Sequence, residues 1–150
     1  MKIVFLDMDG VLNRLNRFGS LITPKGKQHT VFRVDPSKSE MINQWAVDHN
    51  IHLVISSTWR LSLTKPEFLA YSRLSPLVLH PDWQTQTSHE TSAPHRRLSE
   101  IQSWVAAHPT TERWVAIDDM EVPTPHLILI NPQHGLQAAD LDTALEYLNA

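Results

Sequence analysis

The chain has 150 residues, of which 41% are hydrophobic and 19% are charged, and its formal net charge is −3. This composition is typical of one globular domain rather than a disordered chain, and no apolar stretch approaches the roughly 20 residues that span a membrane. The absence of cysteine excludes a disulfide framework and thiolate metal sites. We therefore expect one domain over residues 1–150. We also expect a cytoplasmic location, because the apolar run at the start is too short for a signal peptide.

The first predicted strand, Ile3 to Leu6, delivers two carboxylates to its end. Its consecutive apolar residues suit a central parallel strand that is covered on both faces. Asp7 and Asp9 follow, and side chains two positions apart in an extended segment point the same way. Gly10 then allows a sharp turn. A pair that only caps the next element is the alternative, but ionised aspartates are rarely held against an apolar strand without a partner.

The next segment, residues 12–34, alternates turn residues with short apolar pieces, and this pattern predicts a β-hairpin flap. The segment has no acidic residue and five basic ones: Arg14, Arg17, Lys25, Lys27 and Arg33. Such a basic segment can bind an anionic ligand, and Arg14 and Arg17 are the candidate substrate-binding residues. A solvated basic hairpin is the alternative explanation.

A helix predicted from Pro36 leads into a second apolar strand, Ile51 to Ile55. The strand is followed by the polar run Ser56-Ser57-Thr58-Trp59-Arg60. Three elements are predicted next: a helix within Pro66 to Leu74, a short strand at Leu77 to Leu79, and a polar loop from Pro81 to Pro94 that can line a site.

The last third of the chain predicts a helix, two strands and a closing helix. The first helix has one apolar face, formed by Leu98, Ile101, Trp104 and Val105. A strand at Trp114 to Ile117 ends in Asp118-Asp119, and a fifth strand is predicted at Leu127 to Ile130. This alternation of strands and helices predicts a doubly wound α/β fold, a three-layer α/β/α sandwich around a parallel sheet.

Ligands of such sheets collect at the carboxyl ends of the strands. We therefore expect Asp7, Ser56 and Asp118 to meet at one edge of the sheet. Bringing several carboxylates together costs several kcal/mol even at an effective dielectric of about 20, so a cation must offset the repulsion. Mg²⁺ is the expected cofactor, because it takes carboxylates, waters and substrate phosphate as ligands.

These motifs together resemble the haloacid dehalogenase (HAD) superfamily of phosphohydrolases. Asp7-Met8-Asp9-Gly10-Val11 matches its first motif, Ser56 after an apolar strand matches the second, and Asp118-Asp119 matches the acidic fourth. The third motif is a lone basic residue, usually lysine, ahead of the acidic strand. Arg97 is the best match for it, and Arg96 and Lys65 are alternatives.

The resemblance implies a role for each of these residues. Asp7 would be the nucleophile and Asp9 the general acid and base. The metal ligands would be Asp7, the backbone carbonyl of Asp9, and Asp118, with Asp119 as a ligand or a support. The phosphate-binding groups would be the Ser56 hydroxyl, the Ser57 backbone N–H and Arg97. Trp59 and Arg60 would contact the leaving group; a buried tryptophan beside a surface arginine is the alternative.

The resemblance also bears on the substrate. Many HAD enzymes carry an inserted cap domain, but the segments between the motifs of this chain are too short for a large one. Capless relatives commonly act on macromolecules, including nucleic-acid ends. We therefore expect a Mg²⁺-dependent phosphohydrolase whose partner is a phosphorylated substrate, nucleic acid among them, and not a membrane. The alternative is a catalytically silent module that binds a phosphorylated partner. A phosphoacceptor receiver domain is disfavoured, because Ser56 stands where its acceptor aspartate would be.

Overall fold

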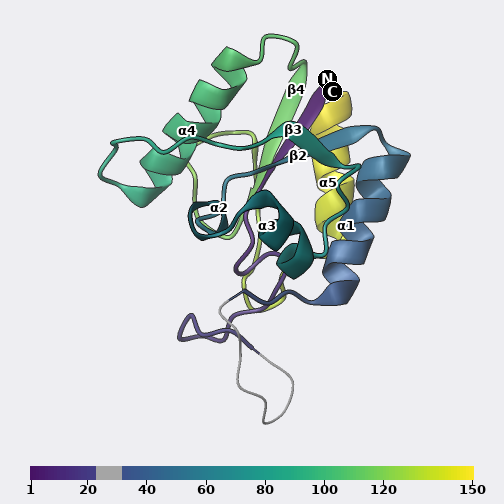
Figure 1. Ribbon diagram of the computed structural model, residues 1–150, viewed down its shortest axis with the longest axis vertical. Helices are drawn as coiled ribbons and strands as arrows, with labels where there is room; N and C mark the ends of the chain where they lie inside the picture. The colour runs from purple at the N-terminus through teal and green to yellow at the C-terminus, as the bar shows by residue number, and fades with distance from the viewer. Residues whose placement is uncertain (23–31) are drawn as a thin grey trace.

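The computed structural model describes residues 1–22 and 32–150, and its centre is one sheet of five parallel strands (Figure 1). The strands are β1 (Lys2–Leu6), β2 (Ile51–Ile55), β3 (Leu79–Gln84), β4 (Arg113–Asp118) and β5 (Leu127–Leu129). Their order is β3-β2-β1-β4-β5. The chain builds outward from β1 in one direction and then returns to build in the other, so the predicted doubly wound sheet is confirmed.

Helices cover both faces of the sheet and complete the three predicted layers (Figure 1). They are α1 (Pro36–Asp48), α2 (Trp59–Ser62), α3 (Lys65–Ser72), α4 (Ala93–Ala107) and α5 (Ala138–Asn149). Side chains of β1 alternate between two cores. Val4 and Leu6 belong to the core of α1 and α5, whereas Ile3 and Phe5 belong to the core of α4. Burial on both faces explains the unbroken apolar run of β1.

The third strand corrects the sequence prediction, which placed a short strand at Leu77 to Leu79 and a loop from Pro81. The strand instead runs from Leu79 to Gln84 and includes Pro81. It lies at the edge of the sheet, where a proline without an N–H donor is tolerated.

Two helical predictions also need correction. The single turn α2, which begins at Trp59 within the polar run that follows β2, was not predicted. The buried face of α4 is formed by Arg97, Glu100, Ile101 and Trp104. Leu98 and Val105, which the pattern placed on that face, are half-buried, and Val105 packs against the core beneath α4 as predicted.

The connection between β1 and α1 contains no inserted domain over its described residues. An antiparallel bridge joins Leu15 to Leu21, and the backbone N–H of Ile22 donates to the carbonyl of Arg14. The described part of the predicted flap is therefore a tight turn. The remainder of the flap, residues 23–31 with Lys25 and Lys27, lies outside the described residues. Over the described residues, the fold is the predicted three-layer sandwich without a large cap.

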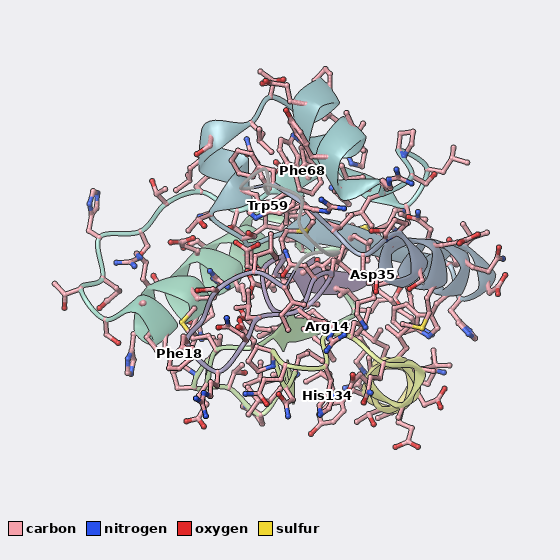
Figure 2. The ribbon with its side chains drawn as sticks, turned by 90° about the horizontal axis from the view of Figure 1, so that it is seen from below. Arg14, Phe18, Asp35, Trp59, Phe68 and His134 are labelled. Carbon is pink, nitrogen blue, oxygen red and sulfur yellow. The ribbon has the colours of Figure 1, made fainter. Side chains whose placement is uncertain are left out.

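The register of the three central strands aligns their carboxyl ends. The last residue of β1 pairs with the last residue of β2 and with the next-to-last residue of β4. Ser56, Asp7 and Asp118 therefore lie side by side at the point where the strand order reverses, as predicted. Figure 2 views the molecule from this end. Among the described residues, no helix is both long and apolar enough to cross a membrane.

Candidate active site

Three aspartates converge at this edge of the sheet. Asp7, Asp118 and Asp119 each offer a carboxylate oxygen, and these oxygens lie within 4.8 Å of one another. Asp7 and Asp118 are buried, and Asp119 is half-buried. Asp7 is fixed to the sheet because its backbone N–H donates to the carbonyl of Ile117 at 3.0 Å. The parallel sheet therefore assembles an acidic cluster from two segments about 110 residues apart in sequence.

Arg97 of α4 is the cation that reaches this acidic cluster. Its Nη1 lies 2.5 Å from Asp118 Oδ2 and 3.3 Å from Asp7 Oδ1. Of the two alternatives, the Arg96 side chain donates to the carbonyl of Glu90, and Lys65 is exposed at the start of α3. Arg97 is thus the basic residue placed beside the predicted nucleophile.

Burial and like charge dominate the electrostatics of the acidic cluster. Burial raises the pKa of Asp7 well above its ordinary value, the charge of Asp118 raises it further, and Arg97 partly offsets both. Burial also raises the pKa of Asp119. For Arg97, burial by itself lowers the pKa, but attraction to Asp7 and Asp118 outweighs it and the net shift is upward. Without a further cation, burial and like charge therefore favour the protonated forms of Asp7 and Asp119.

The residues present fit Mg²⁺, the metal that the fold family implies. The acidic cluster supplies only carboxylate oxygens, which are the hard ligands that Mg²⁺ prefers. Gly10 keeps the space beside the acidic cluster open. Its φ is +81°, and a Cβ at this position would lie 2.4 Å from Asp119 Oδ2. A larger residue at position 10 would displace the Asp119 carboxylate.

Asp9 has a different setting from Asp7. Its Oδ1 accepts a hydrogen bond of 2.8 Å from Asn13 Nδ2, and its Oδ2 accepts one of 3.1 Å from the indole N–H of Trp59. Asn13 is fixed in turn, since its Oδ1 accepts from the backbone N–H of Gly10 at 2.7 Å. Two neutral donors therefore hold the Asp9 carboxylate, which is not one of the three carboxylates of the acidic cluster.

The ends of β2 and β3 contribute buried hydroxyl groups. The hydroxyls of Ser56 and Thr85 are buried and have no hydrogen-bond partner among the described residues. Thr85 lies beside the end of β2, because its N–H donates to the carbonyl of Ile55 at 3.1 Å. Ser57 Oγ accepts from the backbone N–H of Trp59. Buried hydroxyl groups with unused hydrogen-bonding capacity at this edge suit the binding of a polar ligand.

Arg60 is buried, contrary to the alternative in which it lay at the surface. Its guanidinium forms an ion pair with Glu100 of α4 and donates to the carbonyls of Ser56, Ser57 and Thr85. Burial lowers the pKa of Arg60, and the charge of Glu100 partly restores it. These bonds tie the loops that follow β2 and β3 to α4. A contact between Arg60 and substrate stays a prediction.

The two arginines predicted on the flap lie in the turn between β1 and α1. Arg14 Nε donates to the carbonyl of Gln133 at 2.9 Å. The Arg17 guanidinium lies 4.8 Å from the ring centre of Phe18, which is exposed. Arg14 is labelled in Figure 2, which views the molecule from the site end.

Sequence reasoning did not identify Asn13, Thr85 or Glu100. Asn13 and Glu100 had readable signals. Asn13 follows Asp9 by four residues within the turn that Gly10 begins. Glu100 follows Arg97 by three residues, and this spacing places Arg97 and Glu100 on one face of a helix. Thr85 had no such signal, because its position depends on the extension of β3.

Comparison with known families agrees with this geometry. A family model described as the HAD domain in Swiss Army Knife RNA repair proteins matches residues 3–141. No curated protein and no solved structure matches the chain. The match covers the first, second and fourth motifs, Arg97 and nearly the whole fold. The chain therefore belongs to the family of HAD domains found in Swiss Army Knife RNA repair proteins.

Proposed function

We propose that this protein is a Mg²⁺-dependent phosphohydrolase that cleaves phosphomonoesters through an aspartyl-phosphate intermediate on Asp7. The observation that carries the proposal is the contrast between two neighbouring aspartates. Asp7 lies in the acidic cluster beside Arg97, whereas neutral donors hold Asp9. Two carboxylates in separate environments can take separate roles, one as nucleophile and the other as general acid and base.

In the first step, a carboxylate oxygen of Asp7 forms a bond to phosphorus while the bond to the leaving oxygen breaks. Asp9 gives its proton to that oxygen. In the second step, Asp9 takes a proton from a water molecule that attacks the phosphorus, which releases phosphate and restores Asp7. Bound Mg²⁺, held by Asp7, Asp118, Asp119 and the backbone carbonyl of Asp9, would supply positive charge against the phosphate oxygens.

The groups that we propose to bind phosphate come from the end of β2 and from α4, on the edge of the sheet that holds Asp7. The buried Ser56 hydroxyl and the Ser57 backbone N–H stand at the end of β2, and Arg97 approaches from α4. Trp59 acts in this scheme through Asp9, because its indole N–H orients the carboxylate that protonates the leaving group.

Nucleic-acid ends are the substrate class that we propose. The family description names RNA repair proteins. Two features support the same class: the part of the chain that the structure describes holds no large cap to enclose a small metabolite, and residues 12–34 carry five basic residues and no acid.

The test is phosphate release from an aryl phosphate and from 3′- and 5′-phosphorylated oligonucleotides, with Mg²⁺ and with chelator. Wild-type protein should release phosphate only with Mg²⁺. Asp7→Asn should lower the rate by on the order of a thousandfold or more, because it removes the nucleophile. Asp142→Asn, an exposed position on α5, is the matched control and should retain the rate.

Turnover that persists in Asp7→Asn, or in chelator, would contradict the mechanism. Tight binding of a phosphorylated oligonucleotide without any turnover would support the second candidate, a silent binding module.

A further inference from the structure

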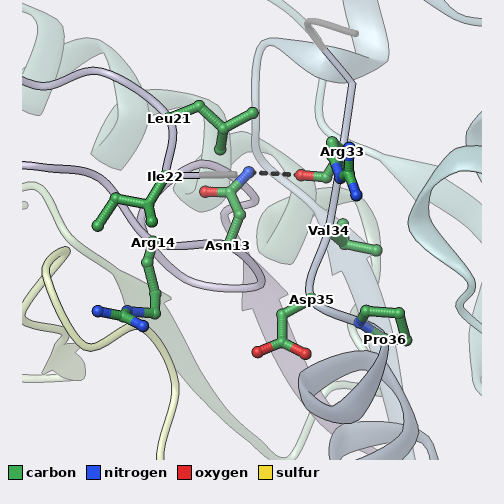
Figure 3. A pocket seen from close by; sticks show the side chains of 8 residues that line it. All are labelled: Asn13, Arg14, Leu21, Ile22, Arg33, Val34, Asp35 and Pro36. Atoms are coloured by element: carbon green, nitrogen blue, oxygen red, sulfur yellow. Dashed lines mark hydrogen bonds between the residues drawn. The ribbon is translucent and has the colours of Figure 1, made fainter. Parts of the chain in front are cut away.

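A cavity of about 390 Å³ lies beside the site, between the turn after β1 and the start of α1 (Figure 3). Its lining comes from three stretches of the chain: Asn13 and Arg14, Leu21 and Ile22, and Arg33 to Pro36. This volume is within the range of about 300–1,000 Å³ that is typical of small-ligand sites.

The cavity is one side chain away from the Asp9 carboxylate. Asn13 Nδ2 donates both to Asp9 Oδ1 and to the carbonyl of Arg33, each at 2.8 Å. Figure 3 shows this amide reaching across to Arg33. In the proposed mechanism Asp9 protonates the leaving oxygen, so the body of the leaving group must lie on the Asp9 side of the phosphorus. Because Asn13 both donates to Asp9 and lines the cavity, the cavity adjoins the part of the site that holds Asp9.

The cavity combines apolar walls with cationic side chains. Leu21, Ile22, Val34 and Pro36 supply the apolar surface. Arg14 and Arg33 supply two positive charges. Among the described lining residues, the one acid is Asp35, which caps α1: its carboxylate accepts from the backbone N–H and the hydroxyl of Ser37. An anionic group with a flat apolar portion fits this lining.

We propose that this cavity binds the terminal nucleoside of a nucleic-acid strand, the one whose oxygen carries the phosphate to be removed. The base lies against the apolar walls, and Arg14 and Arg33 pair with the adjoining phosphodiesters. This inference rests on the proposed function. A phosphoserine peptide fits less well, because a phosphoserine has no flat apolar body next to the phosphoester.

Binding tests the inference without requiring turnover. The probe is a phosphorylated oligonucleotide, compared with the same strand carrying an abasic terminal residue, both in chelator. Wild-type protein should bind the intact strand at least tenfold more tightly than the abasic strand. Ile22→Trp, which fills the cavity from a side chain that is already 41% exposed, should bring the two dissociation constants close together.

Leu77→Trp is the matched control, because Leu77 is 84% exposed and lies outside the cavity lining. It should keep the wild-type ratio of dissociation constants. Equal binding of intact and abasic strands by wild type would overturn the inference, as would an unchanged ratio in Ile22→Trp or tighter binding of a phosphopeptide of equal charge.

These outcomes can be told apart from failure of the proposed function. If aryl phosphate is hydrolysed with Mg²⁺ and the terminal base has no effect on binding, the mechanism stands and the inference is wrong. If no phosphoester is hydrolysed but the base effect and its loss in Ile22→Trp are observed, the cavity site stands and the hydrolase proposal is wrong.

Discussion

Asp7 and Asp9 are separated by one residue, yet their carboxylates have different partners. Asp7 faces two acids and one arginine, and Asp9 accepts hydrogen bonds from an amide and an indole. The motif places both carboxylates on the same side of the chain. Their neighbours then distinguish them.

Trp59→Phe should distinguish the role of Trp59 in positioning Asp9 from its role in packing. Phenylalanine keeps the ring that packs against Phe68 but removes the N–H that donates to Asp9. We expect kcat/KM to fall about tenfold for alkyl phosphates, whose leaving oxygen needs a proton, and little for nitrophenyl phosphate. The measurement is kcat/KM over a series of leaving groups.

Trp45→Phe is the control for this series. The indole N–H of Trp45 is buried and meets no acceptor among the described residues, so its removal should change neither class of substrate. An equal loss on alkyl and nitrophenyl phosphates in Trp59→Phe would indicate a packing role instead.

The raised pKa of Asp7 makes a prediction about stability in chelator. Burial and the charge of Asp118 raise this pKa in the folded protein. An acid with a raised folded pKa stabilises the fold below its unfolded pKa of about 4, and this contribution is lost as the pH rises through the folded pKa. Asp7→Asn should therefore increase the free energy of unfolding at pH 7 by about 1 kcal/mol or more.

Urea unfolding between pH 4 and pH 8 measures this effect. The advantage of Asp7→Asn should shrink toward pH 4, where the wild-type carboxyl is protonated. If Asp7→Asn is instead less stable than wild type at pH 7 in chelator, the attraction between Asp7 and Arg97 stabilises the fold more than burial of the Asp7 charge destabilises it.

At the scale of elements, α4 connects two halves of the site. Arg97 reaches the acidic cluster, and one turn later Glu100 pairs with Arg60. Arg60 in turn holds the carbonyls of Ser56 and Ser57 at the end of β2. One face of this helix therefore positions both the basic residue beside Asp7 and the loop proposed to bind phosphate.

Glu100→Gln should test this connection. Removing the carboxylate leaves the Arg60 guanidinium buried without its counter-charge, which should cost about 3 kcal/mol of unfolding free energy and weaken inhibition by inorganic phosphate. Glu146→Gln, an exposed position on α5, should change stability by less than about 0.5 kcal/mol. Unaltered phosphate inhibition in a folded Glu100→Gln protein would argue against coupling between the ion pair and the loop.

Over the whole molecule, positive and negative charge are separated along the chain. Residues 12–34 are basic, whereas no lysine or arginine occurs from Ala116 to the last residue. The described basic residues of the turn lie near the site end, so they can attract a polyanion toward the acidic cluster without lying in it.

Charge reversal of Arg14 and Arg17 should weaken binding of a phosphorylated oligonucleotide and flatten its salt dependence. For a single strand, the slope of log K against log salt is negative, and its magnitude should decrease by about 0.7 for each phosphate contact that is lost. Arg113→Glu, at the opposite end of the sheet, should leave the slope unchanged. A wild-type slope in the Arg14 and Arg17 variants would exclude the turn from nucleic-acid binding.

The sequence by itself predicted the fold because its strongest signals are local. Apolar runs mark four of the five strands closely, and Pro36 marks the start of α1. The sequence prediction was wrong about the third strand. A strand can contain Pro81 because it lies at the edge of the sheet, and only the strand order reveals that position. The pattern also contained a signal for Arg97 over Arg96: Arg97, Ile101 and Trp104 recur at the spacing of one helical face.

Motif order determined that Asp7, Ser56 and Asp118 meet at one edge, since parallel strands align their carboxyl ends whatever the loops contain. Only the tertiary structure decided that Trp59 donates to Asp9, that Arg60 is buried against Glu100, and that a cavity opens beside Asn13. These features join residues tens of positions apart through side-chain packing. The spacing of residues along the chain predicts the backbone elements. The direction of each long side chain depends on its neighbours in the folded structure, which the spacing does not reveal.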